Sequence, residues 1–507
     1  MSSSNAIAKN TLFLYVRMLV NMGVSLFTSR VILHTLGVED FGLYNLVGGV
    51  VVLFTFLNNP MIATTQRFIN VEKVSKIVEN VNKIFNLSLS IHFIISLLIL
   101  LLAETVGLWF LNYKLNIPAD RMYAANFVFQ LSILTTVIDV MRVPYNAMII
   151  AYERMSYYAF LSIFETIAKL IIVYLLVVFP DLDKLILYSI LLMLVNLVTN
   201  FIFYSYCRNN FKQETTFKKY KDTARIKELL SFSSWMLVGQ LAVVAAAQGM
   251  NMILNIFNGV VVNAALAIAT QVNGVLYGFI GNFQVAFNPQ IVQSYASGEY
   301  ERNKKLILTT SKYSFFLMAI LSAPFLFFTK SILTLWLGND LPAYAENFIP
   351  VIIFCSIIDA LAGPFWISAQ AIGSIKEYNI TLTVINLFTL PLAYVLLKMG
   401  YAPIYAFVGK FFIAVALQLF RYYFINKYIR FNKKHFASYI FRVIVIFALL
   451  ALILMFRNSA TVTFIQMTWK VAVIELLLLI CILLVGLENE EKKLIWSFLK
   501  NKLQRAG

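Results

Sequence analysis

Long apolar stretches recur along the whole chain and constrain its fold more than any other feature. Fourteen stretches of about 20 residues are apolar enough to cross a bilayer. They cover approximately residues 12–33, 41–60, 84–111, 123–150, 158–179, 185–206, 229–256, 260–287, 306–328, 348–375, 380–399, 403–424, 439–457 and 468–487. Each can form a membrane-spanning helix, so the sequence predicts an all-α integral membrane protein. Because fourteen is an even number, we expect both termini on the same side of the membrane.

The composition excludes a water-soluble enzyme. The 507 residues are 60% hydrophobic and 13% charged, with a mean hydropathy of +0.79, whereas soluble domains carry about 25% charged residues. The three cysteines lie far apart, so neither a disulfide framework nor a cysteine metal site is predicted. No phosphate-binding loop, serine hydrolase motif or zinc protease motif occurs. We therefore expect a transporter with no cofactor, metal or catalytic residue.

An enzyme of another class, a membrane glycosyltransferase or polymerase, is the alternative interpretation. It would require acidic residues in a large outer loop. The predicted outer loops do not exceed about 20 residues, which favours the transporter.

Basic residues are concentrated on one side of the predicted helices. With the N-terminus in the cytoplasm, about 29 of the 41 Lys and Arg residues fall in inside segments and about 7 in outside ones. The net charge of +17 is therefore interpreted as an orientation signal, with both termini cytoplasmic, and not as nucleic-acid binding. The densest basic loops, 208–227 and 427–442, are expected beside anionic lipid headgroups.

The two halves of the chain resemble each other. Residues 137–145 match residues 357–365 at an offset of 220, with an Asp and a Pro in register. The stretch from Gly37 to Tyr44 similarly matches the one that begins at Gly259, at an offset of 222. Six helices therefore repeat as six, and because six is even, the repeats are parallel and related by an axis along the membrane normal.

These repeats predict the organisation of the chain, in which two bundles move about a site at their shared interface. The predicted segments are an N-terminal six-helix bundle (1–206), a cytoplasmic basic linker (207–228), a C-terminal six-helix bundle (229–424), an appended helix pair (425–487) and a cytoplasmic interfacial tail (488–507).

Ionisable side chains inside the predicted helices are the first candidate functional residues, because each costs some 3 kcal/mol to insert into a bilayer. Arg17 lies on a polar stripe of the first helix that also contains Asn10, Asn21, Ser25 and Thr28. Asp139 and Arg142 are three residues apart, and Glu165 and Lys169 are four apart, so each pair can meet on one helix face. Such pairs either only neutralise each other, or release one member when a substrate or a proton arrives.

The second half carries a different set of polar residues. Asp359 has no basic neighbour in the sequence, and is either a proton or cation site or a structural Asp beside a kink at Pro364. Asp139, Glu165 and Asp359 are thus the candidates for coupling to H+ or Na+. Uncharged polar side chains that can bind sugar hydroxyls, or serve only as interhelical contacts, are Gln248, Asn251, Asn255, Thr270 and Asn273.

Residues 36–44, LGVEDFGLY, follow a first helix that carries Arg17. This stretch resembles the polysaccharide-export branch of the multidrug, oligosaccharidyl-lipid and polysaccharide exporter superfamily. The likeness extends over the whole chain through the number of helices, the parallel halves and the added C-terminal pair, and is closest to bacterial O-antigen type flippases. It implies a MATE-like fold in the bacterial inner membrane.

The resemblance also implies a function. Such a flippase moves an undecaprenyl-pyrophosphate-linked oligosaccharide from the cytoplasmic to the periplasmic leaflet by alternating access, for O-antigen, capsule or exopolysaccharide synthesis. Arg17, Arg142 and Lys169 would contact the pyrophosphate, and the amide-rich helix faces would contact the sugars. The implied partners are the lipid-linked oligosaccharide, membrane lipid, a coupling cation and a polysaccharide polymerase. A lipid II flippase and a cation-coupled multidrug exporter of the same superfamily are the alternatives.

Overall fold

The chain is all helical in the part that the structure describes, which confirms the predicted fold class. The computed structural model describes residues 2–53, 58–74, 77–152, 154–179, 182–285, 287–338, 341–373, 375–456 and 464–493, and its first described side chain is that of Leu19.

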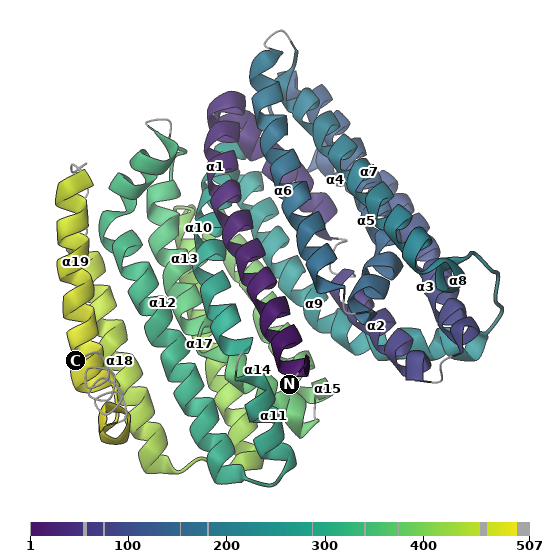
Figure 1. Ribbon diagram of the computed structural model, residues 1–507. Coiled ribbons are helices and arrows are strands. Elements are labelled where there is room, and N and C mark those ends of the chain that lie inside the picture. Colours follow the sequence, from purple (N-terminus) through teal and green to yellow (C-terminus); the bar gives the residue numbers. More distant parts are fainter. Residues whose placement is uncertain are drawn as a thin grey trace, which may run out of the picture. The chain divides into compact units, whose positions relative to one another are not determined.

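The helices fall into two compact units (Figure 1). Unit 1 comprises Met1–Ala267 and Thr389–Pro403, and unit 2 comprises Ile268–Phe388 and Ile404–Gly507. The main helices of unit 1 are α1 (Ser2–Val52), α2 (Asn58–Val74), α3 (Val78–Leu102), α4 (Leu108–Tyr113), α5 (Met122–Ala151), α6 (Met155–Val178), α7 (Lys184–Asn210), α8 (Lys212–Thr215), α9 (Thr223–Asn258) and α16 (Thr389–Lys398). Those of unit 2 are α11 (Asn288–Ala296), α12 (Tyr300–Leu337), α13 (Ala345–Asp359), α14 (Ala362–Ile372), α15 (Ile375–Leu387), α17 (Ile404–Ile429), α18 (Lys433–Met455) and α19 (Phe464–Cys481). Helix α10 (Val260–Val285) begins in unit 1 and ends in unit 2.

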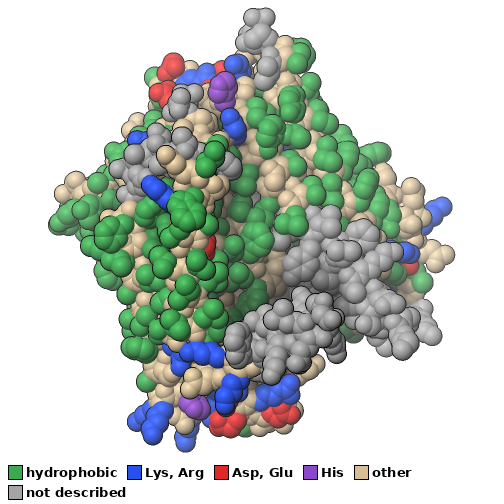
Figure 2. Space-filling model, turned by 60° about the vertical axis from the view of Figure 1, so that its left-hand side comes forward, with side chains coloured by type: hydrophobic (Ala, Val, Ile, Leu, Met, Phe, Trp, Pro, Cys, Tyr) green, Lys and Arg blue, Asp and Glu red, His purple; other side chains and the backbone are tan. Residues whose placement is uncertain are grey.

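Thirteen helical segments of the described residues are long and apolar enough to cross a membrane. The sequence predicts fourteen spans, and the difference lies in α1, which contains the predicted stretch 12–33 and most of the stretch 41–60. Hydrophobic side chains cover the flanks of the helices on the face drawn in Figure 2, and Lys and Arg gather toward the helix ends. This distribution is typical of a protein whose helices are surrounded by lipid.

Two glycines give the repeated stretches the same backbone corner. Gly37 interrupts α1 with φ 79° and ψ 170°, and Gly259, which separates α9 from α10, has φ 73° and ψ −173°. Positive φ at these values is accessible to glycine and strained for other residues. The offset of 222 found in the sequence therefore relates two residues with the same backbone conformation. Gly37 lies within α1, whereas Gly259 lies between two separate helices, α9 and α10.

The repeated stretches also contact each other, within unit 1. A Cβ atom on Gly42 would lie 2.1 Å from the carbonyl oxygen of Val260 and 3.2 Å from the backbone nitrogen of Ala264. Ala264 is the residue that the offset of 222 makes equivalent to Gly42. Contact between equivalent residues is expected where two repeats meet at their common axis.

The acidic residue at the centre of the LGVEDFGLY stretch has a structural partner. Arg121 donates to both carboxylate oxygens of Asp40, at 2.8 and 2.6 Å, and its Nη1 atom lies 2.7 Å from Asp183 Oδ2. Asp183 in turn caps α7 by accepting from the backbone of Leu185 at 3.0 Å. One guanidinium thus connects α1, just after its bend at Gly37, to the beginnings of α5 and α7.

The basic segment that the sequence predicts as a linker is docked on α3. The buried amide of Asn82 donates to the carbonyls of Gln213 and Thr216, at 3.0 and 2.7 Å. Lys83 Nζ lies 2.7 Å from Asp222, and its hydrogen bond holds the pKa of that carboxyl below the usual range. Residues 213–222 therefore belong structurally to unit 1.

Replacing Gly42 with Ala should destabilise the protein by about 1–3 kcal/mol, because the new methyl group would overlap the backbone of α10. Gly48→Ala is the matched control, since Gly48 lies in the same helix and a Cβ there meets no atom within 4 Å. Thermal unfolding of the purified variants in detergent measures the difference. Equal midpoints for the two variants would contradict the close approach.

Candidate functional site

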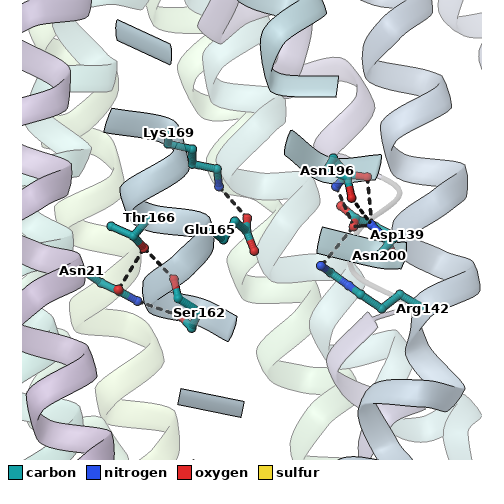
Figure 3. A network of polar contacts seen from close by, with 9 residues as sticks. All are labelled: Asn21, Asp139, Arg142, Ser162, Glu165, Thr166, Lys169, Asn196 and Asn200. Atoms are coloured by element: carbon teal, nitrogen blue, oxygen red, sulfur yellow. Dashed lines mark hydrogen bonds and ion pairs between the residues drawn. The ribbon is translucent and has the colours of Figure 1, made fainter. Parts of the chain in front are cut away.

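The first predicted ion pair lies between α5 and α7. Arg142 Nη2 is 3.0 Å from Asp139 Oδ1, and their side chains are 21% and 24% exposed. Asp139 Oδ1 also accepts from the amides of Asn196 and Asn200 on α7, at 2.8 and 3.4 Å (Figure 3). The guanidinium of Arg142 lies 5.2 Å from the ring centre of Phe203. The carboxylate therefore has one charged and two neutral donors.

The second predicted pair lies on α6. Lys169 Nζ donates to Glu165 Oε1 at 2.7 Å, and the lysine side chain is 48% exposed. Arg142 is close enough to attract Glu165 electrostatically, so the two pairs form one charged cluster within unit 1. Lysine and arginine in such a cluster can bind a phosphate if the carboxylates give way.

Asn21 of α1 contacts α6 near this cluster. Asn21 donates to Ser162 Oγ at 2.9 Å and accepts from Thr166 Oγ1 at 2.9 Å (Figure 3). Ser162 is three residues from Glu165 and four from Thr166, so it lies on the helix face of α6 between them. Arg17 belongs to the same predicted polar stripe as Asn21, but its side chain lies outside the described residues.

The predicted amide residues of α9 mostly bind other protein groups. Asn255 is fully buried, accepts from the backbone of Asn116 at 2.8 Å and donates to Asn263 at 3.1 Å. Asn263 donates to Asn251 Oδ1 at 2.6 Å, and Asn251 donates to the carbonyl of Asn45 at 3.4 Å. This is an interhelical network, the alternative that the sequence left open for these residues, and their contact with sugars stays a prediction.

The remaining predicted amide and hydroxyl residues are more accessible. Gln248 is half-buried, and its side-chain amide packs closely against Gly49. A Cβ atom on that glycine would lie only 2.6 Å from Gln248 Oε1. Thr270 is exposed and Asn273 is half-buried, both on the part of α10 that belongs to unit 2. Among the described residues, the enclosed Oδ1 atom of Asn273 has no hydrogen-bond partner.

Asp359 ends α13 in unit 2, and the structure gives it a basic neighbour that sequence reasoning missed. Arg421 of α17 places Nη1 4.0 Å from Asp359 Oδ1. The repeat offset of 220 assigns Arg421 to position 201, next to Asn200, which binds the equivalent Asp139. This register was the signal that could have revealed it.

A second ion pair was also missed, because its members are far apart in the sequence. Lys312 of α12 is 2% exposed and donates to Glu491 at 2.9 and 2.7 Å. It attaches the beginning of the predicted tail to unit 2. Most of that tail, 494–507, lies outside the described residues.

Asn255→Ala should lower the stability by about 1–3 kcal/mol, because it removes the buried amide that binds the backbone of Asn116 and leaves the buried Oδ1 atom of Asn263 without that donor. Gln248→Ala, on the same helix but half-buried, should change stability by less than about 0.5 kcal/mol. Thermal unfolding tests both. An unchanged midpoint for Asn255→Ala, together with lost transport, would instead favour a direct role in binding sugar.

Comparisons with known proteins agree with this architecture. The family model described as polysaccharide biosynthesis protein matches residues 7–295, and the MatE model matches residues 236–395. A search of curated proteins found no match.

Several solved membrane proteins have a similar fold. An inward-facing multidrug resistance MATE family transporter of the MOP superfamily is 14% identical, with 81% of this chain and 95% of that chain covered and a TM-score of 0.66. The lipid II flippase MurJ, in an inward closed conformation, is 12% identical, with coverages of 92% and 97% and a TM-score of 0.68. An outward-facing MATE transporter has 14% identity, coverages of 84% and 97%, and a TM-score of 0.57.

At these identities the structural likeness shows the fold, while the first family model covers more than half of the sequence. The all-helical fold of the described residues is in keeping with that match. The chain therefore belongs to the polysaccharide biosynthesis protein family.

Proposed function

We propose that the protein is a flippase that moves an undecaprenyl-pyrophosphate-linked oligosaccharide from the cytoplasmic to the periplasmic leaflet of the bacterial inner membrane. It does so by alternating access, with both termini in the cytoplasm, and supplies O-antigen, capsule or exopolysaccharide synthesis. The polysaccharide family match and the fold shared with a lipid II flippase support this proposal.

The observation that carries the proposal is the charged cluster of α5 and α6. Arg142 and Lys169 lie inside apolar helices, where a charge without a purpose is costly. A pyrophosphate can replace Asp139 as the partner of Arg142, because Asp139 keeps two amide donors from α7 when the guanidinium leaves. Arg17 completes the proposed set of pyrophosphate contacts.

Sugar binding is assigned to the polar faces of α9 and α10. Gln248 and Thr270 are the accessible members of the predicted set, and Asn273 has a free acceptor. Asn251 and Asn255 support these faces through the interhelical network.

The direction of transport follows from charge. With the cell interior negative, outward movement of an anionic headgroup is downhill by about 2.3 kcal/mol per charge for each 100 mV. The membrane potential therefore favours export over import of a pyrophosphate-linked substrate.

Deletion of the gene tests the substrate class. Cells without the protein should lose surface polysaccharide and accumulate a lipid-linked sugar on the cytoplasmic leaflet, identified by mass spectrometry of extracted lipids. Accumulation of lipid II would instead assign the role of the MurJ-like alternative. Normal polysaccharide with increased sensitivity to cationic drugs would assign a multidrug exporter, for which Asp139 and Glu165 would be the binding groups.

The double variant Asp139→Asn, Arg142→Gln tests the anion site. It removes the cation without leaving an unpaired charge, and should reduce surface polysaccharide in the complemented deletion strain by about tenfold or more, the effect of losing a charged phosphate contact. Glu299→Gln, Arg302→Gln is the matched control, an exposed pair with the same spacing. Full activity in the first double variant, at equal membrane abundance, would refute the site.

A further inference from the structure

The end of α13 is held in one position by side chains from two other helices. Pro364 cannot donate to the carbonyl of Ala360, four residues earlier, and Gln284 of α10 donates to that carbonyl at 2.9 Å. Tyr277 of α10 donates to the carbonyl of Asp359 at 3.2 Å, and Ser311 of α12 donates to that of Leu361 at 2.9 Å. Asp359 is therefore fixed at its backbone, and only its side chain can adjust.

Arg421 faces this fixed carboxylate from inside unit 2. Its side chain is 15% exposed, and its enclosed Nη1 atom has no hydrogen bond in the described part of the chain. Among the described residues, Asp359 is the carboxylate that lies within 4.0 Å of Arg421. A guanidinium stays protonated in proteins, and Asp359, whose side chain is 37% exposed, is the carboxylate that lies beside it.

Two tyrosines and a lysine also lie near the pair. Tyr277 of α10 is close enough to both Asp359 and Arg421 to interact electrostatically, and Tyr378 of α15 is close to Arg421. Lys410, on the same helix as Arg421, interacts with Cys355 of α13. Neither phenol is an anion at neutral pH.

We propose that Arg421 is the permanent counter-ion of Asp359. Its guanidinium occupies the position in which a cation-coupled carrier would bind its transported cation. The proposal rests on the flippase function proposed above. Because the guanidinium lies beside the carboxylate, Asp359 does not offer a free negative charge to Na+ or another external cation. Unit 2 therefore requires no external cation during the transport cycle. Arg421 is the positioning residue that makes transport independent of such a cation.

Transport in liposomes containing the full-length protein tests the proposal. The probe is the lipid-linked sugar extracted from the deletion strain, and the measured quantity is its rate of appearance in the opposite leaflet. Wild-type rates should respond to a K+ diffusion potential and stay within about twofold when a Na+ or pH gradient is imposed. Arg421→Gln should be about tenfold slower, and recover when Na+ is added or the pH is lowered.

Two further variants separate a counter-ion from a structural role. The neutral double variant Asp359→Asn, Arg421→Gln should regain cation-independent transport. Lys427→Gln, which removes an exposed lysine of α17, should behave as wild type. A wild-type rate that depends on a Na+ or pH gradient would overturn the proposal, as would an Arg421→Gln rate that no cation restores.

A binding measurement keeps the proposal testable if the probe is not transported. Thermal unfolding is compared in NaCl and in choline chloride, and Na+ should stabilise Arg421→Gln but not the wild type. Absence of transport together with this pattern would refute the flippase function and leave the counter-ion supported. Stabilisation of the wild type by Na+ would refute the counter-ion whatever the transport result.

Discussion

A charge at bilayer depth needs an opposite charge nearby, and the polar interior of this protein is organised around that requirement. In unit 1 the partners come from a single helix, as in Asp139 with Arg142, and α7 adds neutral amides. In unit 2 the partner of Asp359 comes from another helix, α17. The two halves therefore solve the same electrostatic problem at equivalent carboxylates with donors from different places in the sequence.

Much of the fold could be predicted from the sequence because its causes are local. Apolar stretches long enough to span a bilayer specify helices whatever their tertiary contacts, and spacings of three or four residues specify which side chains meet on a helix. Both intrahelical pairs were found in this way. Gly37 and Gly259 were matched by sequence alone, and their shared positive φ explains why both positions are glycine.

The rest depended on packing between distant segments. Arg421 and Asp359 are separated in the sequence by α14, α15 and α16, so no spacing rule brings them together. The amides of α9 were assigned by type, whereas their hydrogen bonds depend on Asn116, a loop residue of unit 1. The repeated proline did not predict one helix geometry. Helix α5 continues through Pro144, whereas the equivalent segment with Pro364 divides into α13 and α14. Side chains of α10 and α12 stabilise that division.

The contact at Gly42 has a consequence for motion within unit 1. There the backbone of α1 approaches the backbone of α10 without an intervening side chain. Side chains can adopt alternative rotamers and let helices slide by small steps, but two backbones in van der Waals contact have no such freedom. This corner must therefore remain intact or separate completely during any rearrangement, which makes it a natural reference point for measuring how the other helices move.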